Sequence, residues 1–306
     1  MKTLIKIALG FLLLVSAAAA TGNNNCVYTD VYQSASGNCI TGGVNLAQIT
    51  DASSFVLGNY NYVDQCLEIE ANCNSLTASM DTMNVAQRVD MVANATGCDN
   101  GLFQGADISL KDNCATDSNI TQWAIQGADA IGSCNEINQW TESKIKDNCL
   151  TMGNMMQLSD FGVCATGNDN CIDQGLYQCA SDNSLTGSSL WQQAAKVANV
   201  LGCYNVVDQG CNFQSAEYNC LTGSMLNQII CENAQITGNC NFAGQYADTS
   251  AFCNSLVNAG MLQSINEEAI MEGCDNEIYQ NVCLNTDENC MTGGMLTQSS
   301  VISSND

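Results

Sequence analysis

The stretch CDNEIYQNVCLNTDENCMTGGMLTQ, residues 274–298, nearly repeats CYNVVDQGCNFQSAEYNCLTGSMLNQ, residues 203–228. Each stretch holds two glutamines, two apolar runs and an Asn-Cys-x-Thr-Gly turn in the same order. Self-similarity at a fixed period indicates a chain built from stacked structural repeats. The pattern of residues inside one repeat therefore decides the fold.

The two glutamines recur along the chain in eight copies, and the first of them is spaced 32 to 39 residues from its equivalents. The residue two positions before each glutamine is apolar in every copy, whereas the immediate neighbours are mixed and often polar. This period of two predicts strands with one inward face. The first set is Gln33, Gln65, Gln104, Gln139, Gln174, Gln209, Gln245 and Gln280. The second set is Gln48, Gln87, Gln122, Gln157, Gln192, Gln228, Gln263 and Gln298.

A buried glutamine without a hydrogen-bond partner costs about 1–3 kcal/mol. Strands stacked in register about 4.8 Å apart place each glutamine over its equivalent, where the amides bond along the column. The alternative is two exposed polar rows, which would also expose the apolar positions beside them. We predict an all-β fold, a β-solenoid of about eight stacked β-arch repeats with two to three strands and about 35 residues each. The repeats lie near residues 25–58, 59–97, 98–133, 134–167, 168–202, 203–239, 240–273 and 274–306.

Short apolar pieces precede the start of each copy, such as FVLG at residues 55–58 and VANVLG at residues 197–202. These pieces are the candidates for a third, shorter strand. Residues 188–202 also fit an amphipathic helix, which remains a local alternative.

The first twenty residues have the organisation of a secretory signal peptide. Lys2 and Lys6 precede an apolar run at residues 7–15, and small residues follow at residues 16–20. The apolar run is too short for a transmembrane helix. We therefore expect residues 21–306 to form a single solenoid domain that is secreted and lies outside the cell or on its surface, with no membrane span.

Twenty cysteines in an exported chain predict disulfides. A thiolate metal site is disfavoured because the chain has no histidine and no CxxC pair. The turn cysteines are predicted to share one column: Cys39, Cys73, Cys114, Cys149, Cys220 and Cys290. The cysteines at the start of a copy are predicted to share another: Cys98, Cys134, Cys203, Cys240 and Cys274. Bridges along a column and bridges across one rung both remain open.

The chain carries 31 acidic and 7 basic residues, which argues against nucleic acid and anionic lipid as partners. With no histidine and few basic residues, it offers no evident acid–base pair, and we expect no enzymatic activity. No cofactor is predicted. Oxygen ligands for Ca²⁺ exist in turns such as residues 275–276 and 287–288, although neither an EF-hand nor an RTX nonapeptide is present.

Repeat arrays usually end in atypical capping repeats, and both ends of this chain look like ordinary copies. Open strand edges at both ends predict head-to-tail assembly of the protein with itself, with a cell-envelope polymer as a possible further partner. The alternative is a secreted binding module such as an adhesin, or one that binds glycan, mineral or ice. Its support is a set of outward aromatic residues at successive copies: Tyr32, Phe103, Trp140, Tyr177, Tyr246 and Tyr279.

The apolar-x-Gln, Asn turn, apolar-x-Gln pattern resembles the strand–turn–strand repeats of curlin-type functional amyloids. The longer copies and the many cysteines depart from curlins and are more similar to the amyloid-like sheath proteins that encase filamentous methanogenic archaea. The resemblance covers residues 25–306 as a style of repeat. It implies a self-assembling, disulfide-stabilised sheath, wall layer or fibre outside the cell, and no catalysis.

Overall fold

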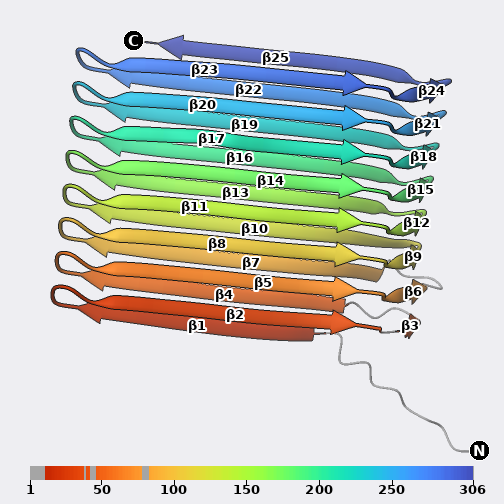
Figure 1. The fold of residues 1–306 in the computed structure, drawn as a ribbon, viewed down its shortest axis with the longest axis horizontal. Helices are drawn as coiled ribbons and strands as arrows, with labels where there is room; N and C mark the ends of the chain where they lie inside the picture. Colours follow the sequence, from red (N-terminus) through yellow and green to blue (C-terminus); the bar gives the residue numbers. More distant parts are fainter. Residues whose placement is uncertain (1–10, 38, 42–45, 78–82, 306) are drawn as a thin grey trace, which may run out of the picture.

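The computed structural model describes residues 11–37, 39–41, 46–77 and 83–305. The described residues form strands β1 to β25 and no helix. The strands stack in parallel into three sheets, and the predicted all-β solenoid of stacked repeats is confirmed. Figure 1 shows a flat ladder in which two sheets of long strands lie over each other.

Sheet A has nine strands and forms one broad face of the solenoid. Its strands are β1 (Phe11–Thr21), β4 (Leu46–Leu57), β7 (Met83–Thr96), β10 (Ser118–Ile131), β13 (Asn154–Thr166), β16 (Ser189–Leu201), β19 (Met225–Thr237), β22 (Gly260–Glu272) and β25 (Met295–Asn305). Sheet B has eight strands and forms the other broad face. Its strands are β2 (Cys26–Ser36), β5 (Tyr62–Asn72), β8 (Gly101–Lys111), β11 (Glu136–Lys146), β14 (Cys171–Ser181), β17 (Val206–Glu217), β20 (Phe242–Phe252) and β23 (Glu277–Asp287).

Sheet C has eight strands of three residues each and closes one narrow side, on the right in Figure 1. Its strands are β3 (Cys39–Thr41), β6 (Ser75–Thr77), β9 (Cys114–Thr116), β12 (Cys149–Thr151), β15 (Ser184–Thr186), β18 (Cys220–Thr222), β21 (Ser255–Val257) and β24 (Cys290–Thr292). We call one sheet B strand with the sheet C and sheet A strands that follow it a rung. The eight rungs start at β2, β5, β8, β11, β14, β17, β20 and β23, and β1 lies outside them.

The third strand of each copy is the turn segment itself, such as Cys220–Thr222. The apolar pieces before the next copy, which were the candidates for that strand, instead continue the long sheet A strand. Residues 189–201 form β16, with burial that alternates along the strand, so the helical alternative is wrong. The pattern of Leu190, Ala194, Val197 and Leu201 fitted a helix, but in-register pairing with β13 and β19 satisfies the backbone of this segment.

The core fills the space between sheets A and B and is divided along the strands. One apolar cluster lies beside sheet C and includes Leu150, Leu185 and Leu221. A second lies beside the opposite loops and includes Ile137 and Ile172. Polar columns run between these clusters, and they are the feature that distinguishes this interior from an ordinary apolar core.

Candidate functional site

The second set of glutamines forms one continuous column in sheet A. All eight are register partners of their equivalents, from Gln48 with Gln87 to Gln263 with Gln298. From Gln87 to Gln298, each Nε2 donates to the Oε1 of the preceding rung over 2.8–3.1 Å. Each amide therefore satisfies its neighbour, which removes the cost of burying it.

The same glutamines also join sheet A to sheet B. The Nε2 of Gln157 donates to the backbone oxygen of Ser143 over 2.8 Å and to that of Cys179 over 3.2 Å. Gln192 makes the equivalent pair of bonds to Gln178 and Ser215. The column therefore holds the two broad sheets together as well as holding each rung to the next.

The first set of glutamines forms a second column, in sheet B, from Gln65 to Gln280. Their Nε2 to Oε1 distances are 2.7–3.0 Å, again from each rung to the preceding one. The prediction for Gln33 is wrong: its register partner is Ile69, and Thr29 is the partner of Gln65. The Nε2 of Gln33 donates instead to the Ile49 backbone oxygen over 2.9 Å.

The displacement of Gln33 has a simple cause. The first two rungs are aligned by their loops, where the Asn25 backbone N–H donates to Asn61 Oδ1 over 3.0 Å, a separation of 36 residues. Gln33 and Gln65 are 32 residues apart, so they lie four positions out of register. Four is an even number, and Gln33 therefore still faces inward and is buried.

Two columns of asparagine also run through the molecule. One stands at the start of sheet B strands and consists of Asn25, Asn61, Asn100, Asn135, Asn170, Asn205, Asn241 and Asn276. The other stands at the turn before sheet C and includes Asn74, Asn113, Asn148, Asn183, Asn219, Asn254 and Asn289. Asn38, which the sequence places in this turn, lies outside the described residues.

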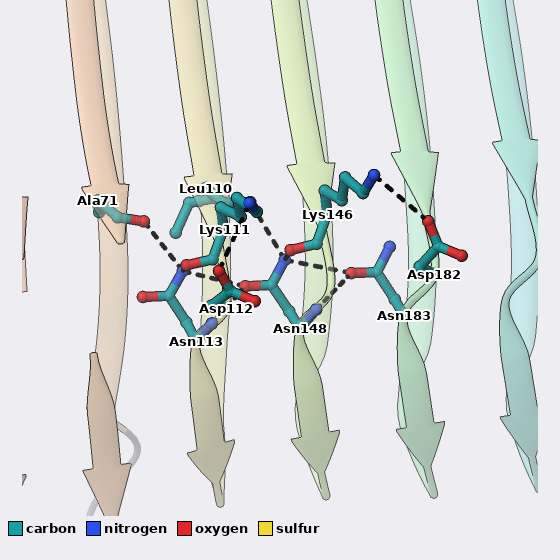
Figure 2. Close-up of polar contacts among 9 residues, drawn as sticks. All are labelled: Ala71, Leu110, Lys111, Asp112, Asn113, Lys146, Asn148, Asp182 and Asn183. Atoms are coloured by element: carbon teal, nitrogen blue, oxygen red, sulfur yellow. Dashed lines mark hydrogen bonds and ion pairs between the residues drawn. The ribbon is translucent and has the colours of Figure 1, made fainter. Parts of the chain in front are cut away.

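Figure 2 shows how one turn asparagine is held. The Nδ2 of Asn148 donates to the Lys146 oxygen over 2.8 Å, the Leu110 oxygen over 3.2 Å and Asn183 Oδ1 over 3.1 Å. Its own Oδ1 accepts from the backbone and side-chain nitrogens of Asn113 over 2.9 and 3.0 Å. The asparagine amides donate toward the following rung, opposite to the glutamines, so the two sets of dipoles oppose each other.

The loop asparagines were not predicted, although the sequence carries their signal. Gly-x-x-Asn occurs before all eight sheet B strands, for example Gly132 to Asn135 and Gly167 to Asn170. The glycines have φ values of 105–141°. A Cβ on Gly167 would lie 1.7 Å from the Gly132 backbone oxygen, so close stacking of these loops requires glycine.

Five of the six turn cysteines share one column as predicted, and Cys73 does not. Cys39, Cys114, Cys149, Cys220 and Cys290 occupy one register position in sheet C, with serine at 75, 184 and 255. Cys73 is not in this column, because Asn74 is the turn asparagine of its rung and Cys73 precedes it with a φ of 55°. Within this column Cys114 and Cys149 are direct partners.

The cysteines at the start of a copy do not form one column. Cys134 and Cys240 have left-handed φ values of 58° and 57°, at the loop position that Asp99 and Tyr204 fill in other rungs. Cys98, Cys203 and Cys274 lie one position earlier, directly after glycine. None of the cysteines whose side chains the structure describes forms a disulfide.

One interior column of sheet A carries charge. Phe161, Lys196, Glu232 and Glu267 are successive register partners and all are buried. The Lys196 ammonium lies 5.2 Å from the Phe161 ring centroid and donates to the Gln174 backbone oxygen. The Asn212 amide donates to Glu232 from a bulge in β17, where an additional residue shifts the register.

The carboxylates of this column are short of partners. Neither oxygen of Glu267 accepts a hydrogen bond from the residues described. Burial raises the pKa of Glu267 to about 7. Burial also raises the pKa of Glu232 well above its usual value; Lys196 counteracts this, while Glu267 and Asp208 add to it.

The outward aromatic residues do not form a single row. Phe103 and Tyr279 lie in one column of sheet B, Trp140 and Tyr246 in a second, and Tyr32 and Tyr177 outside both. The Trp140 ring covers the next rung at Gly175, where a Cβ would meet its Cε3 at 2.1 Å. These six residues therefore form no continuous aromatic row along sheet B.

The last rung differs from the others in exposure. Leu190, Leu226, Met261 and Leu296 share one inward column, and these residues are 0, 0, 2 and 45 % exposed. The exposed positions continue along β25 to Ile302, which is 51 % exposed. Within the described residues, no strand pairs with the outer edges of β23, β24 and β25.

Two further observations concern ligands and membranes. The residues that the structure describes contain no group of three or more cysteines and carboxylates arranged to hold a metal ion. They also include no helix with the length and hydropathy that crossing a bilayer requires.

Comparisons with protein-family models, with curated proteins and with solved structures found no match to this chain.

Proposed function

We propose that this protein is an extracellular structural protein that assembles head to tail with itself by β-strand stacking. The observation that carries the proposal is the last rung, where an interior apolar column and three strand edges lie open to solvent. Open strand edges are templates for pairing with another chain. A heterologous contact of this kind extends indefinitely, as a sheath, a wall layer or a fibre.

The polar columns favour the same assembly. Glutamine Nε2 atoms point toward earlier rungs, so Gln280 and Gln298 present their Oε1 atoms at the open end. Asparagine and glutamine ladders are a recurring feature of stacked, in-register strands. A second copy that stacks in the same orientation continues the sheet A glutamine column from Gln298 to Gln48, whereas in sheet B Gln280 would meet Thr29. Catalysis has no part in this proposal.

The experiment is sedimentation and electron microscopy of the protein lacking residues 1–20, with a matched pair of variants. Leu296→Lys with Ile302→Lys places two charges on the inward face of the open rung and is expected to abolish elongation. Thr297→Lys with Val301→Lys adds the same charge to the same strand on its outward face and is expected to assemble. A protein that remains monomeric at all concentrations, or inward lysines without effect, would contradict the proposal.

We further propose that disulfides reinforce the stack, beginning with Cys114 and Cys149. These residues are partners on adjacent parallel strands. Strands about 4.8 Å apart fall inside the roughly 4.4–6.8 Å Cα separation of disulfides. Mild oxidation is expected to join Cys114 to Cys149 and to add about 2–4 kcal/mol to the free energy of unfolding. Cys149→Ser should abolish the gain, whereas Cys164→Ser, whose register neighbours are Asp129 and Asn199, should not.

A further inference from the structure

Strand β1 occupies an unusual place in the fold. Sheet A has nine strands, whereas sheets B and C have eight, and β1 is the additional one. It lies at the end of the ladder opposite β25 and pairs with β4 alone in this sheet (Figure 1). Residues 11–20 of this strand belong to the segment predicted to be a signal peptide, which remains a prediction.

The pairing of β1 with β4 extends over eleven residues in parallel, from Phe11 with Ala47 to Thr21 with Leu57. It continues the register of the solenoid, because Leu12 is the partner of Gln48 and thus stands at the next position of the glutamine column. β1 therefore fills the place that one more copy of a sheet A strand would take.

The strand with the matching register at the open end is β25. It also has eleven residues, and its Gln298 stands in the glutamine column as the partner of Gln263. If β25 of a second copy paired with β4, Gln298 would stand where Leu12 stands. Nine residues of β25, from Thr297 to Asn305, would then oppose the segment from Ala47 to Phe55 that β1 pairs with. The two strands cannot occupy this edge together.

The hydrogen-bonding groups also match. In this column each Nε2 donates to the Oε1 of the preceding rung, and Gln48 has a leucine position before it. Its Nε2 donates only to the Glu70 backbone oxygen among the acceptors identified, over 3.0 Å. Gln298 of a second copy would bring an Oε1 to this position, and its Nε2 is already used by Gln263. A leucine has no amide acceptor to offer.

We propose that the outer edge of β4 is the docking site for β25 of a second copy, and that β1 caps this site until it is detached. This inference rests on the proposed head-to-tail assembly. Detachment is the hydrolysis of one peptide bond near Ala20 by a peptidase: water gives its hydroxyl to the carbonyl carbon and a proton to the released amine. The β25 strand of the second copy then takes the place of β1 and runs toward Gly22 and β2 of the first copy. No peptide bond joins it to them.

The test uses the full chain with a site-specific protease sequence inserted between Thr21 and Gly22, purified uncut. The uncut protein is expected to remain as short species, and cutting should increase the mean sedimentation coefficient at least tenfold. A second variant, Ala18→Pro with Ala20→Pro, disrupts pairing of β1 without cutting. The N–H groups of these residues lie on the same side of the strand as that of Gly22, which donates to the Leu57 oxygen, and proline has no N–H to donate. This variant should elongate without being cut. It therefore tests capping by β1 even if, in the cut protein, the cleaved segment stays bound to β4.

The outcomes separate the two proposals. If uncut, cut and proline-bearing proteins all elongate alike, capping by β1 is wrong and head-to-tail assembly stands. If none of the three elongates, head-to-tail assembly is wrong, and the capping falls with it. If the cut or the proline-bearing protein elongates and the uncut one does not, both stand. In the cut protein, Leu296→Lys with Ile302→Lys should then stop growth, and growth in its presence would overturn β25 as the docking strand.

Discussion

Two kinds of column run through the interior of this solenoid, and they tolerate sequence change differently. The glycine, asparagine and glutamine columns keep one residue type through nearly every described rung. The column of Phe161, Lys196, Glu232 and Glu267 holds three residue types in four successive rungs. Identity is needed where a residue contacts its own equivalent. A column that contacts other groups can vary, although in this column Glu267 is left without a hydrogen-bond partner among the described residues.

The largest expected effect is in the glycine column. Gly167→Ala places a Cβ 1.7 Å from the Gly132 oxygen at a φ of 137°, so the loops must separate. We expect a loss of more than about 3 kcal/mol in the free energy of unfolding, since left-handed strain and steric overlap add. Urea denaturation followed by circular dichroism measures this loss.

The control for that change is Gly162→Ala, within the neighbouring strand β13. A Cβ there meets nothing within 4 Å, and we expect a change within about 1 kcal/mol. Equal effects at the two glycines would show that loop stacking does not require glycine.

The next effect concerns the asparagine column. Asn148→Leu keeps the approximate size of the side chain but leaves the Asn113 backbone N–H without its acceptor and removes the Asn148 Nδ2 donor from the Leu110 and Lys146 oxygens. Each buried polar group left unpaired costs about 1–3 kcal/mol, and we expect a total loss of about 2–3 kcal/mol by the same measurement. Asn138→Leu is the control, because its partly exposed amide donates only to Glu136, and it should cost less than about 0.5 kcal/mol.

A smaller effect is expected in the charged column, and it depends on pH. Because burial raises the pKa of Glu267 to about 7, the folded protein holds a proton there that the unfolded chain has released. The associated stability is complete below the unfolded pKa of 4.5 and is lost as the pH rises toward 7. The melting temperature should therefore fall between pH 5 and pH 8, which are about the limits of this window.

Replacing both carboxylates removes this dependence. Glu232→Gln with Glu267→Gln cannot ionise, and at about pH 8 the variant should be more stable than the parent by about 1–2 kcal/mol, and nearly equal to it at about pH 5. The control is Glu136→Gln, which replaces an exposed carboxylate, and its stability should equal that of the parent at both pH values. If the melting temperature of the double variant depended on pH as that of the parent does, these two carboxylates would not be the cause of the lower stability at high pH.

The smallest effect is expected outside both kinds of column. Lys144 and Glu142 form a partly exposed ion pair of 2.5 Å on the outer face of sheet B. Lys144→Gln should change the free energy of unfolding by less than about 1 kcal/mol, since exposed pairs contribute little. A loss above about 2 kcal/mol would mean that the surface, and not the interior columns, holds the rungs together.

Much of the candidate site could be read before any coordinates. The two-residue period around Gln104 and Gln139 predicts inward amides, and these are bonded at 2.8 Å. The same reasoning failed at Gln33, because counting residues from glutamine to glutamine gave a register that the loop asparagines override. It also failed for the cysteines at the start of a copy. Cys134 lies one position later in its turn than Cys98 does in its own turn, so the two do not stack.

By itself the sequence determined the number of repeats, the strand faces and the two glutamine columns, because period and burial are properties of short stretches. Only the tertiary structure decided which rungs align, that Lys196 and Glu232 share a column, and that β1 fills the edge of β4. These depend on register between strands more than thirty residues apart. Register is fixed by backbone hydrogen bonds and loop contacts that no single repeat contains.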